Sequence, residues 1–165
     1  MSDNNIIKNI GSIVSNLQSL EFALRAFLNE TKGYLSVAND KPLNLTKLTV
    51  GEWIPENYFT NYDTLKQLIR KTNDELQKRG LSERIDESLI QLRDAIAHGR
   101  VLSLHPEGTP HIVKFSKPVE SMTKVEISVE MTPEWFTQQI RHTQDELLKV
   151  VRLGQSIGLN CFRDD

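Results

Sequence analysis

Residues 92–104 read LRDAIAHGRVLSL, and the spacing of the apolar residues changes within this stretch. Before Gly99, apolar side chains recur every three or four residues, which is typical of an amphipathic α-helix. Beyond it the period becomes two, most clearly in residues 124–131 (KVEISVEM), where apolar and polar side chains alternate. This alternation predicts a half-buried antiparallel strand. The stretch therefore marks the passage from a helical region to a β region.

Helical spacing dominates the chain on both sides of this passage. Glycines follow the first three predicted helices, and Thr132-Pro133 supplies a cap and a first helical residue for the last one. The apolar face of that last helix is expected to contain Phe136, Ile140, Leu147 and Val151, with Gly154 and Gly158 bringing it to a frayed end. The predicted helices cover residues 5–32, 61–79 and 83–98 (the third capped by Ser82), and a last helix from Pro133.

The sequence predicts a mainly α fold: a four-helix bundle with a small antiparallel β-sheet inserted between the third and fourth main helices. The β-excursion covers about residues 101–131, with strands at 101–104, 111–115 and 124–131, in a single domain spanning 1–165. Residues 34–60 lack a sustained period and predict a long connection. Trp53, Tyr58 and Phe59 are expected to anchor this connection to the core.

Composition narrows the class of protein. The chain has 165 residues, 38% hydrophobic and 25% charged, which predicts a globular domain with a real core. Its net charge of −2 excludes a broad basic surface for nucleic acid but not a small basic site within a cleft. With one cysteine, Cys161, neither an intramolecular disulfide nor a cysteine zinc site is possible. No leader pattern and no run of 18 apolar residues is seen, so we expect a cytoplasmic protein without a membrane span.

The end of the third predicted helix carries residues suited to phosphate chemistry. Asp94 and His98 are four positions apart and therefore neighbours on the helix surface, where a carboxylate can orient an imidazole. Arg93 supplies a forked donor that matches a phosphate. At about 100° per residue, Ile90 and Ala97 form a second apolar surface, with Arg93 on one flank and the Asp–His pair on the other. The alternative is a set of solvated residues favoured by the helix dipole.

The stretch LRDAIAHGR resembles the signature of the HEPN (higher eukaryotes and prokaryotes nucleotide-binding) superfamily. In that motif an arginine, often followed by Asn, Asp or His, precedes a histidine by four to six residues near the end of the third main helix. Arg93, Asp94 and His98 match these positions. The resemblance covers about nine residues as sequence and most of the chain as architecture.

The resemblance implies a homodimer in which two motif helices meet around a two-fold axis. It further implies a metal-independent endoribonuclease that uses no cofactor, of the kind found in toxin–antitoxin and abortive-infection systems. The 2′-hydroxyl of the RNA would attack its own 3′-phosphate. His98 would move protons, Arg93 would hold the phosphate, and Asp94 would orient His98 or shape the cleft.

Several alternatives stay open on the sequence alone. One is a non-catalytic HEPN-like module that dimerises and binds a nucleotide or a protein; another is a toxin held by a nucleotidyltransferase-type antitoxin. Arg100 is a candidate phosphate contact. Glu21 either faces the cleft as a substrate-binding residue or pairs with Arg25 four positions on. No obvious aromatic platform for stacking single-stranded bases is seen.

Overall fold

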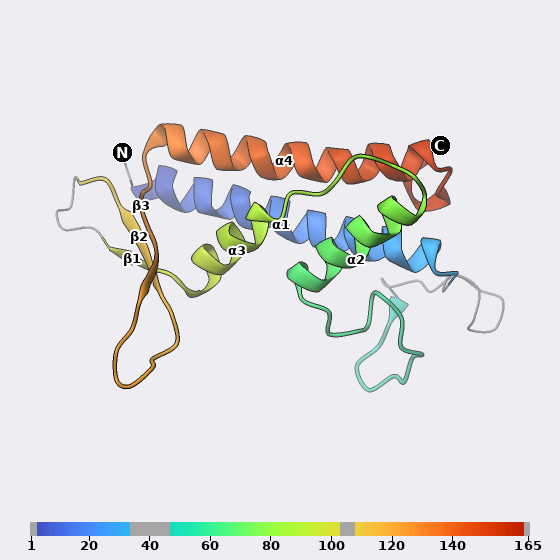
Figure 1. Ribbon diagram of the computed structural model, residues 1–165, viewed down its shortest axis with the longest axis horizontal. Helices are drawn as coiled ribbons and strands as arrows, with labels where there is room; N and C mark the ends of the chain where they lie inside the picture. The colour runs from blue at the N-terminus through green and yellow to red at the C-terminus, as the bar shows by residue number, and fades with distance from the viewer. Residues whose placement is uncertain (1–2, 34–46, 103–107, 164–165) are drawn as a thin grey trace. The chain divides into compact units, whose positions relative to one another are not determined.

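The computed structural model describes residues 3–33, 47–102 and 108–163 (Figure 1). They form two compact units. The first unit combines Met1–Ser19 with Glu87–Leu147, and the second combines Leu20–Asp86 with Leu148–Asp165.

The described part of the chain is mainly helical, with one three-stranded antiparallel sheet between the third and fourth helices, as the change of period predicts. The helices are α1 (Asp3–Thr31), α2 (Leu65–Lys78), α3 (Ser88–His98) and α4 (Pro133–Ser156), followed by a short 3₁₀ helix (Asn160–Phe162). The strands are β1 (Arg100–Leu102), β2 (His111–Phe115) and β3 (Val125–Glu130).

Helix α1 buries apolar side chains that recur every three or four residues along one face, as helical spacing in residues 5–32 predicts. Its fully buried residues are Ile13 in the first unit and Leu20, Leu24, Phe27 and Leu28 in the second. Burying a side chain of this size contributes about 1.5–3 kcal/mol relative to leaving it exposed. The α1 helix ends before Gly33, which adopts a left-handed conformation (φ 73°) that terminates the α-helical hydrogen bonding.

Helix α2 begins at Leu65, four residues later than predicted, because Thr64 and Gln67 form a capping box. The Gln67 N–H donates to Thr64 Oγ1 (3.4 Å), and the Thr64 N–H donates to Gln67 Oε1 (2.8 Å). These two bonds satisfy backbone donors that would be unpaired at the start of a helix. Gly80, with φ 75°, follows the end of α2 as expected.

The predicted start of the third helix is wrong. Residues 82–86 are not helical, and α3 begins at Ser88 instead of residue 83. Asn73 of α2 explains the difference, because its side chain accepts from the Ile85 N–H (2.7 Å) and donates to the Ile85 carbonyl (2.9 Å). These bonds tie both backbone groups of Ile85 to the side chain of Asn73, and Ile85 is still buried.

The three strands form a sheet of order β1-β2-β3, with Val101 opposite Ile112 and Ile112 opposite Val129. Gly99, between α3 and β1, has extended backbone angles (φ −72°, ψ 160°) and not the left-handed ones usual at a helix end. Its role is close approach: a Cβ at this position would lie 2.8 Å from Ile112 Cγ1 and would also collide with the Ala95 carbonyl. The absence of a side chain at Gly99 therefore lets β2 pack against the end of α3.

Helix α4 starts at Pro133 as predicted, and Thr132 Oγ1 accepts from the Trp135 N–H (3.1 Å). Phe136 is buried as predicted, but Ile140, Leu147 and Val151 are only half-buried. Gly154 does not begin a frayed end. The helix runs on to Ser156, and a Cβ on Gly154 would collide with the Phe162 ring. The fully or nearly fully buried apolar residues of α4 are Phe136, Val150 and Leu153.

Candidate functional site

The three motif residues lie in the last two turns of α3, in the first unit. Arg93 and His98 are exposed, and Asp94 is half-buried. Gly99 ends the helix with its N–H bonded to the Ala95 carbonyl (2.7 Å) and leads directly into β1. This short connection holds His98 next to the sheet, so that side chains of β1 and β2 can contribute to the site.

The Arg93 guanidinium bridges the other two motif residues. Its Nη1 lies 3.4 Å from His98 Nε2 and 3.5 Å from Asp94 Oδ1. Positions 93 and 98 are about 140° apart around the helix axis, so the long arginine side chain reaches round the helix surface. On the helix surface Ile90 and Ala97 lie between Arg93 and the Asp–His pair, as the spacing predicts, and the side-chain ends nevertheless meet.

The contact with Arg93 bears on the form of the His98 ring. Because a guanidinium has only donors, a hydrogen bond in this contact needs a neutral ring with its proton on Nδ1 and a lone pair on Nε2. The same lone pair can accept a proton from a hydroxyl once Arg93 takes another partner. In this arrangement Arg93, and not Asp94, is the partner that holds the His98 ring.

A lysine that the sequence interpretation missed completes the charge distribution around Asp94. Lys114 of β2 places Nζ 3.7 Å from Asp94 Oδ2 and 2.9 Å from Glu126 Oε2. The hydrogen bond with Glu126, followed by its charge and that of Asp94, raises the pKa of Lys114. The lysine is therefore a permanent cation at neutral pH. The alternation of HIVKF, which places Ile112 and Lys114 on one face of β2, was the available signal.

A hollow of ≈ 300 Å³ adjoins His98. Arg100 lines it, with the guanidinium carbon 5.4 Å from the centre of the Phe115 ring, a distance typical of a cation–π contact. The predicted contact residue Arg100 is thus brought together with His98, on the strand that follows α3 directly. The remaining lining residues are Phe115, Ser116, Pro118 and Thr123.

A larger cavity of ≈ 460 Å³ lies between α3, the sheet and α4 in the same unit. Its apolar walls include Leu92, Ile112, Val129 and Trp135. Arg93, Asp94 and His98 do not line it. Its size alone therefore does not connect it with the chemistry of the motif.

Glu21 has the local role that was one of its two alternatives. Its Oε1 accepts from Arg25 Nη2 (2.9 Å) and Nε (3.3 Å), an ion pair within α1. Glu21 belongs to the second unit and the motif to the first. The structure thus confirms the pair with Arg25, and substrate binding by Glu21 stays a prediction.

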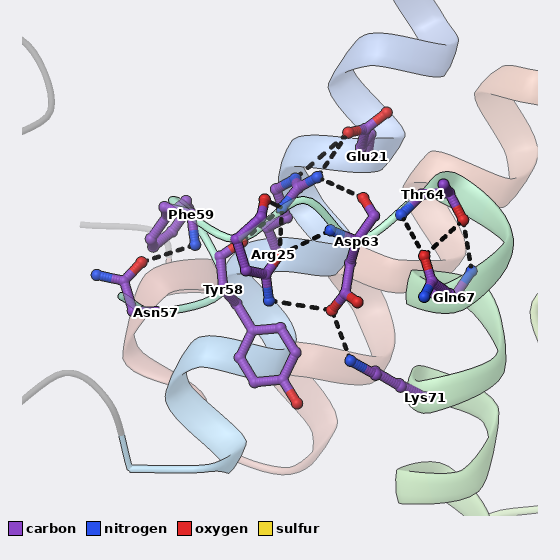
Figure 2. A network of polar contacts seen from close by, with 10 residues as sticks. Glu21, Arg25, Asn57, Tyr58, Phe59, Asp63, Thr64, Gln67 and Lys71 are labelled. Carbon is purple, nitrogen blue, oxygen red and sulfur yellow. Dashed lines mark hydrogen bonds and ion pairs between the residues drawn. The ribbon is translucent and has the colours of Figure 1, made fainter. Parts of the chain in front are cut away.

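Arg25 is the centre of a polar network in the second unit, shown in Figure 2. Its guanidinium donates to the carbonyls of Tyr58 (2.7 Å), Asn61 (3.2 Å) and Asp63 (2.7 Å), and to Asn61 Oδ1 (2.9 Å). Because three backbone carbonyls accept from a single side chain, the network holds residues 58–63 against α1.

The aromatic residues expected to anchor residues 34–60 to the core differ in their exposure and contacts. Trp53 is 99% exposed, so its predicted role as an anchor is wrong. Phe59 contacts Phe22 of α1, with ring centres 5.4 Å apart, and Lys71 lies 5.4 Å from the centre of the Tyr58 ring. The described end of this connection is therefore held mainly by Arg25; residues 34–46 lie outside the described residues.

Cys161 lies far along the chain from the motif and belongs to the second unit. Desolvation of the thiol, followed by its hydrogen bond and charge interaction with Glu30, raises the pKa of Cys161 to about 12. Glu30 Oε1 and Oε2 accept from the backbone N–H groups of Asn160 (2.6 Å) and Cys161 (3.0 Å). A thiol in this setting is protonated at neutral pH and is a poor nucleophile.

The described residues contain no group of three or more histidine, cysteine, aspartate or glutamate side chains arranged to hold a metal ion. None of the described helices combines the length and apolar character needed to cross a membrane.

No protein-family model matches the chain, and neither the curated proteins nor the solved structures contain a significant match. The function is therefore inferred from the residues of this chain and from the resemblance of its motif.

Proposed function

We propose that this protein is a metal-independent endoribonuclease of HEPN type that acts as a homodimer. One observation carries the proposal: Arg93 Nη1 and His98 Nε2 meet at 3.4 Å on the exposed end of α3, beside a hollow lined by His98 and Arg100. The pair combines a proton acceptor with a phosphate-binding cation at adjacent positions. These are the two groups that cleavage of RNA by its own 2′-hydroxyl requires.

The proposed reaction is an internal transfer of the phosphoryl group. His98 Nε2 takes the proton of the ribose 2′-hydroxyl, the 2′-oxygen forms a bond with phosphorus, and the bond from phosphorus to the 5′-oxygen breaks. The leaving oxygen takes a proton from solvent or from the second histidine of the dimer. The products are a 2′,3′-cyclic phosphate and a 5′-hydroxyl end. No metal ion or cofactor is needed, because the nucleophile belongs to the substrate.

Arg93 would stabilise the charge that develops on the phosphate oxygens. Its contacts with His98 and Asp94 are long, at 3.4 and 3.5 Å, so exchanging them for a phosphate loses little. Asp94 would keep the guanidinium near the histidine, and Lys114 would offset the Asp94 charge that repels an RNA. The proposed role of Asp94 is thus to position Arg93.

The homodimer is part of the proposal. Ala97 is exposed and Ile90 half-buried on the α3 surface between the motif positions, which supports a contact with a second motif helix. Two copies of Arg93 and His98 would then share one cleft. The resemblance also supports a role as a toxin or defence nuclease, controlled by a nucleotidyltransferase-type antitoxin or another protein.

The test is incubation of the purified protein with total and synthetic RNA in EDTA, at measured oligomeric state. We expect wild-type protein to produce cyclic phosphate ends, and Arg93→Ala and His98→Ala to lower the rate at least 100-fold. Arg141→Ala and His111→Ala are the matched controls, because both residues lie in the first unit and neither lines the hollow beside His98. Folded, dimeric wild-type protein that leaves all RNA intact would refute the nuclease and favour a non-catalytic module that binds nucleotides or proteins.

The biological role has a separate test. Expression of the wild-type chain should slow cell growth, and His98→Ala should remove the effect at equal protein level. Equal toxicity of both proteins would contradict a nuclease toxin. Mixed dimers of Arg93→Ala and His98→Ala subunits test the shared cleft, since they should recover activity that neither parent shows.

A further inference from the structure

The hollow beside His98 has features that the proposed catalytic step does not use. Phe115 lies at its edge and is 38% exposed, so part of the residue is accessible to a ligand. The Arg100 guanidinium lies 5.4 Å from the centre of this ring. An exposed aromatic ring with an adjacent arginine is the combination that binds bases of single-stranded nucleic acid by stacking and their phosphates by charge.

The charge of the hollow selects for an anionic ligand. Its six described lining residues contain Arg100 and His98 and no carboxylate. The net charge of the whole chain is −2, so this local absence of acidic groups is a property of the site. A nucleotide phosphate fits this distribution, whereas a metal ion or a basic peptide does not.

The size of the hollow suits one nucleotide. Its ≈ 300 Å³ lies at the lower end of the range of about 300–1,000 Å³ that small-molecule sites occupy. A single base with part of its ribose needs a space of this order. A double-stranded RNA could not place a base here without unpairing it, so the site favours single-stranded segments.

The backbone next to Phe115 is hydrogen-bonded across the hairpin. Ser116 donates its N–H to the Lys124 carbonyl (2.8 Å), and Ser116 Oγ accepts from the Lys124 N–H (3.0 Å). Beyond these bonds, Val119 and Met122 close a tight hairpin through two further backbone bonds. These bonds hold the chain that carries Phe115 in the sheet.

The hollow also adjoins the proposed catalytic histidine. His98 itself lines it, and only Gly99 separates His98 from Arg100. A ribose whose 2′-hydroxyl meets His98 Nε2 would therefore lie beside the hollow, within reach of a base bound there. The sequence showed no aromatic platform because Phe115 is 17 positions from His98, and only the pairing of β1 with β2 brings them together.

We propose that this hollow is the base-binding subsite of the enzyme: a base next to the scissile phosphate of single-stranded RNA stacks on Phe115 while Arg100 contacts its phosphate. This inference rests on the proposed endoribonuclease function. Phe115 and Arg100 would then set affinity and sequence preference, whereas Arg93 and His98 would carry the chemical step.

The test measures binding apart from cleavage. The probe is a single-stranded tetranucleotide with 2′-O-methyl riboses, which cannot be cleaved because no free 2′-hydroxyl is present, and with 2-aminopurine as one base. Stacking on an aromatic ring quenches 2-aminopurine fluorescence. We expect saturable quenching by wild-type protein and by Phe115→Tyr, and at least 10-fold weaker binding with reduced quenching by Phe115→Leu, which keeps apolar volume but loses the ring face. Val119→Ala, at the exposed hairpin tip, is the matched control.

Arg100→Gln separates the phosphate contact from the stack. It should weaken binding and lower the salt dependence of the binding constant by the contribution of about one phosphate contact, while quenching at saturation is retained. Unchanged affinity and quenching in Phe115→Leu, with the fold verified by circular dichroism, would overturn the subsite. So would failure of wild-type protein to quench the probe at all.

A parallel cleavage assay on unmodified RNA distinguishes the two proposals. Cleavage by Phe115→Leu with raised KM and nearly unchanged kcat supports the subsite, and cleavage with both constants unchanged refutes it while the nuclease stands. If wild-type protein binds the probe through Phe115 but cleaves no RNA, the subsite stands and the proposed chemistry fails.

Discussion

Replacing Arg25 with alanine should destabilise the second unit more than any other single change at a charged residue that we consider. The Arg25 side chain is 13% exposed and donates to Glu21, to the carbonyls of Tyr58, Asn61 and Asp63, and to Asn61 Oδ1. Hydrogen bonds to charged groups contribute about 1.5–3 kcal/mol each, but these share one guanidinium and the released carbonyls can reach water. We therefore expect a loss of about 3 kcal/mol and not the sum.

A matched control exists on α4. Arg141 also forms an ion pair four residues along a helix, with Asp145 at 3.6 Å, but its side chain is 83% exposed. Arg141→Ala should cost less than about 0.5 kcal/mol. Arg25→Lys should lie between the two, because an ammonium keeps the charge without the fork that reaches several acceptors.

The assay is denaturant unfolding with thermal melting of the three variants. For a chain of this size, 3 kcal/mol lowers Tm by about 6–12 °C. Limited proteolysis should show cleavage near residues 58–63 first, since these residues lose their contact with α1. A loss below 1 kcal/mol in Arg25→Ala, or one equal to that of Arg141→Ala, would refute the reasoning that this network holds the connection in place.

Three further outcomes follow from local geometry. Gly99→Ala should lower Tm and any RNA cleavage together, because the new Cβ cannot fit between α3 and β2; circular dichroism and the cleavage assay check this, and unchanged values would contradict the close packing. Cys161, with its pKa raised to about 12, should react with iodoacetamide at pH 8 at least 100-fold more slowly than a free thiol, and Glu30→Gln should accelerate it. The hydrogen bond from Lys32 lowers the pKa of Glu75 below its usual value of 4.5. The pair of Lys32 and Glu75 therefore contributes stability that is fully present above pH 4.5 and is lost as the pH falls through the lowered pKa. Lys32→Met should thus lower stability at pH 7 and narrow its difference from wild type toward pH 3 in denaturant titrations; a constant difference would contradict this.

The elements whose signals are local were predictable. The long apolar stripe of α1, the cap and proline that start α4, and the alternation of β2 and β3 depend on neighbouring residues, and each is found where its pattern predicts it. The start of α3 was predicted wrongly because Asn73, on another helix, takes both backbone groups of Ile85. A contact between residues 12 positions apart does not change the local spacing of apolar residues, so the sequence pattern does not reveal it.

In the candidate site, too, some features follow from local spacing and others do not. Helical spacing of 3.6 residues is enough to place an arginine, an aspartate and a histidine at the end of one helix. The spacing does not show that the Arg93 side chain reaches both Asp94 and His98, since a long side chain can take several directions from one backbone position.

Lys114, Phe115 and the hollow were likewise decided by tertiary structure. Lys114 and Phe115 belong to strand β2, which can pack against the end of α3 because Gly99 has no side chain. Residues from this strand and from the end of α3 line the hollow together. Strand pairing joins residues that are distant in the chain, and its register depends on packing that no short stretch of sequence contains.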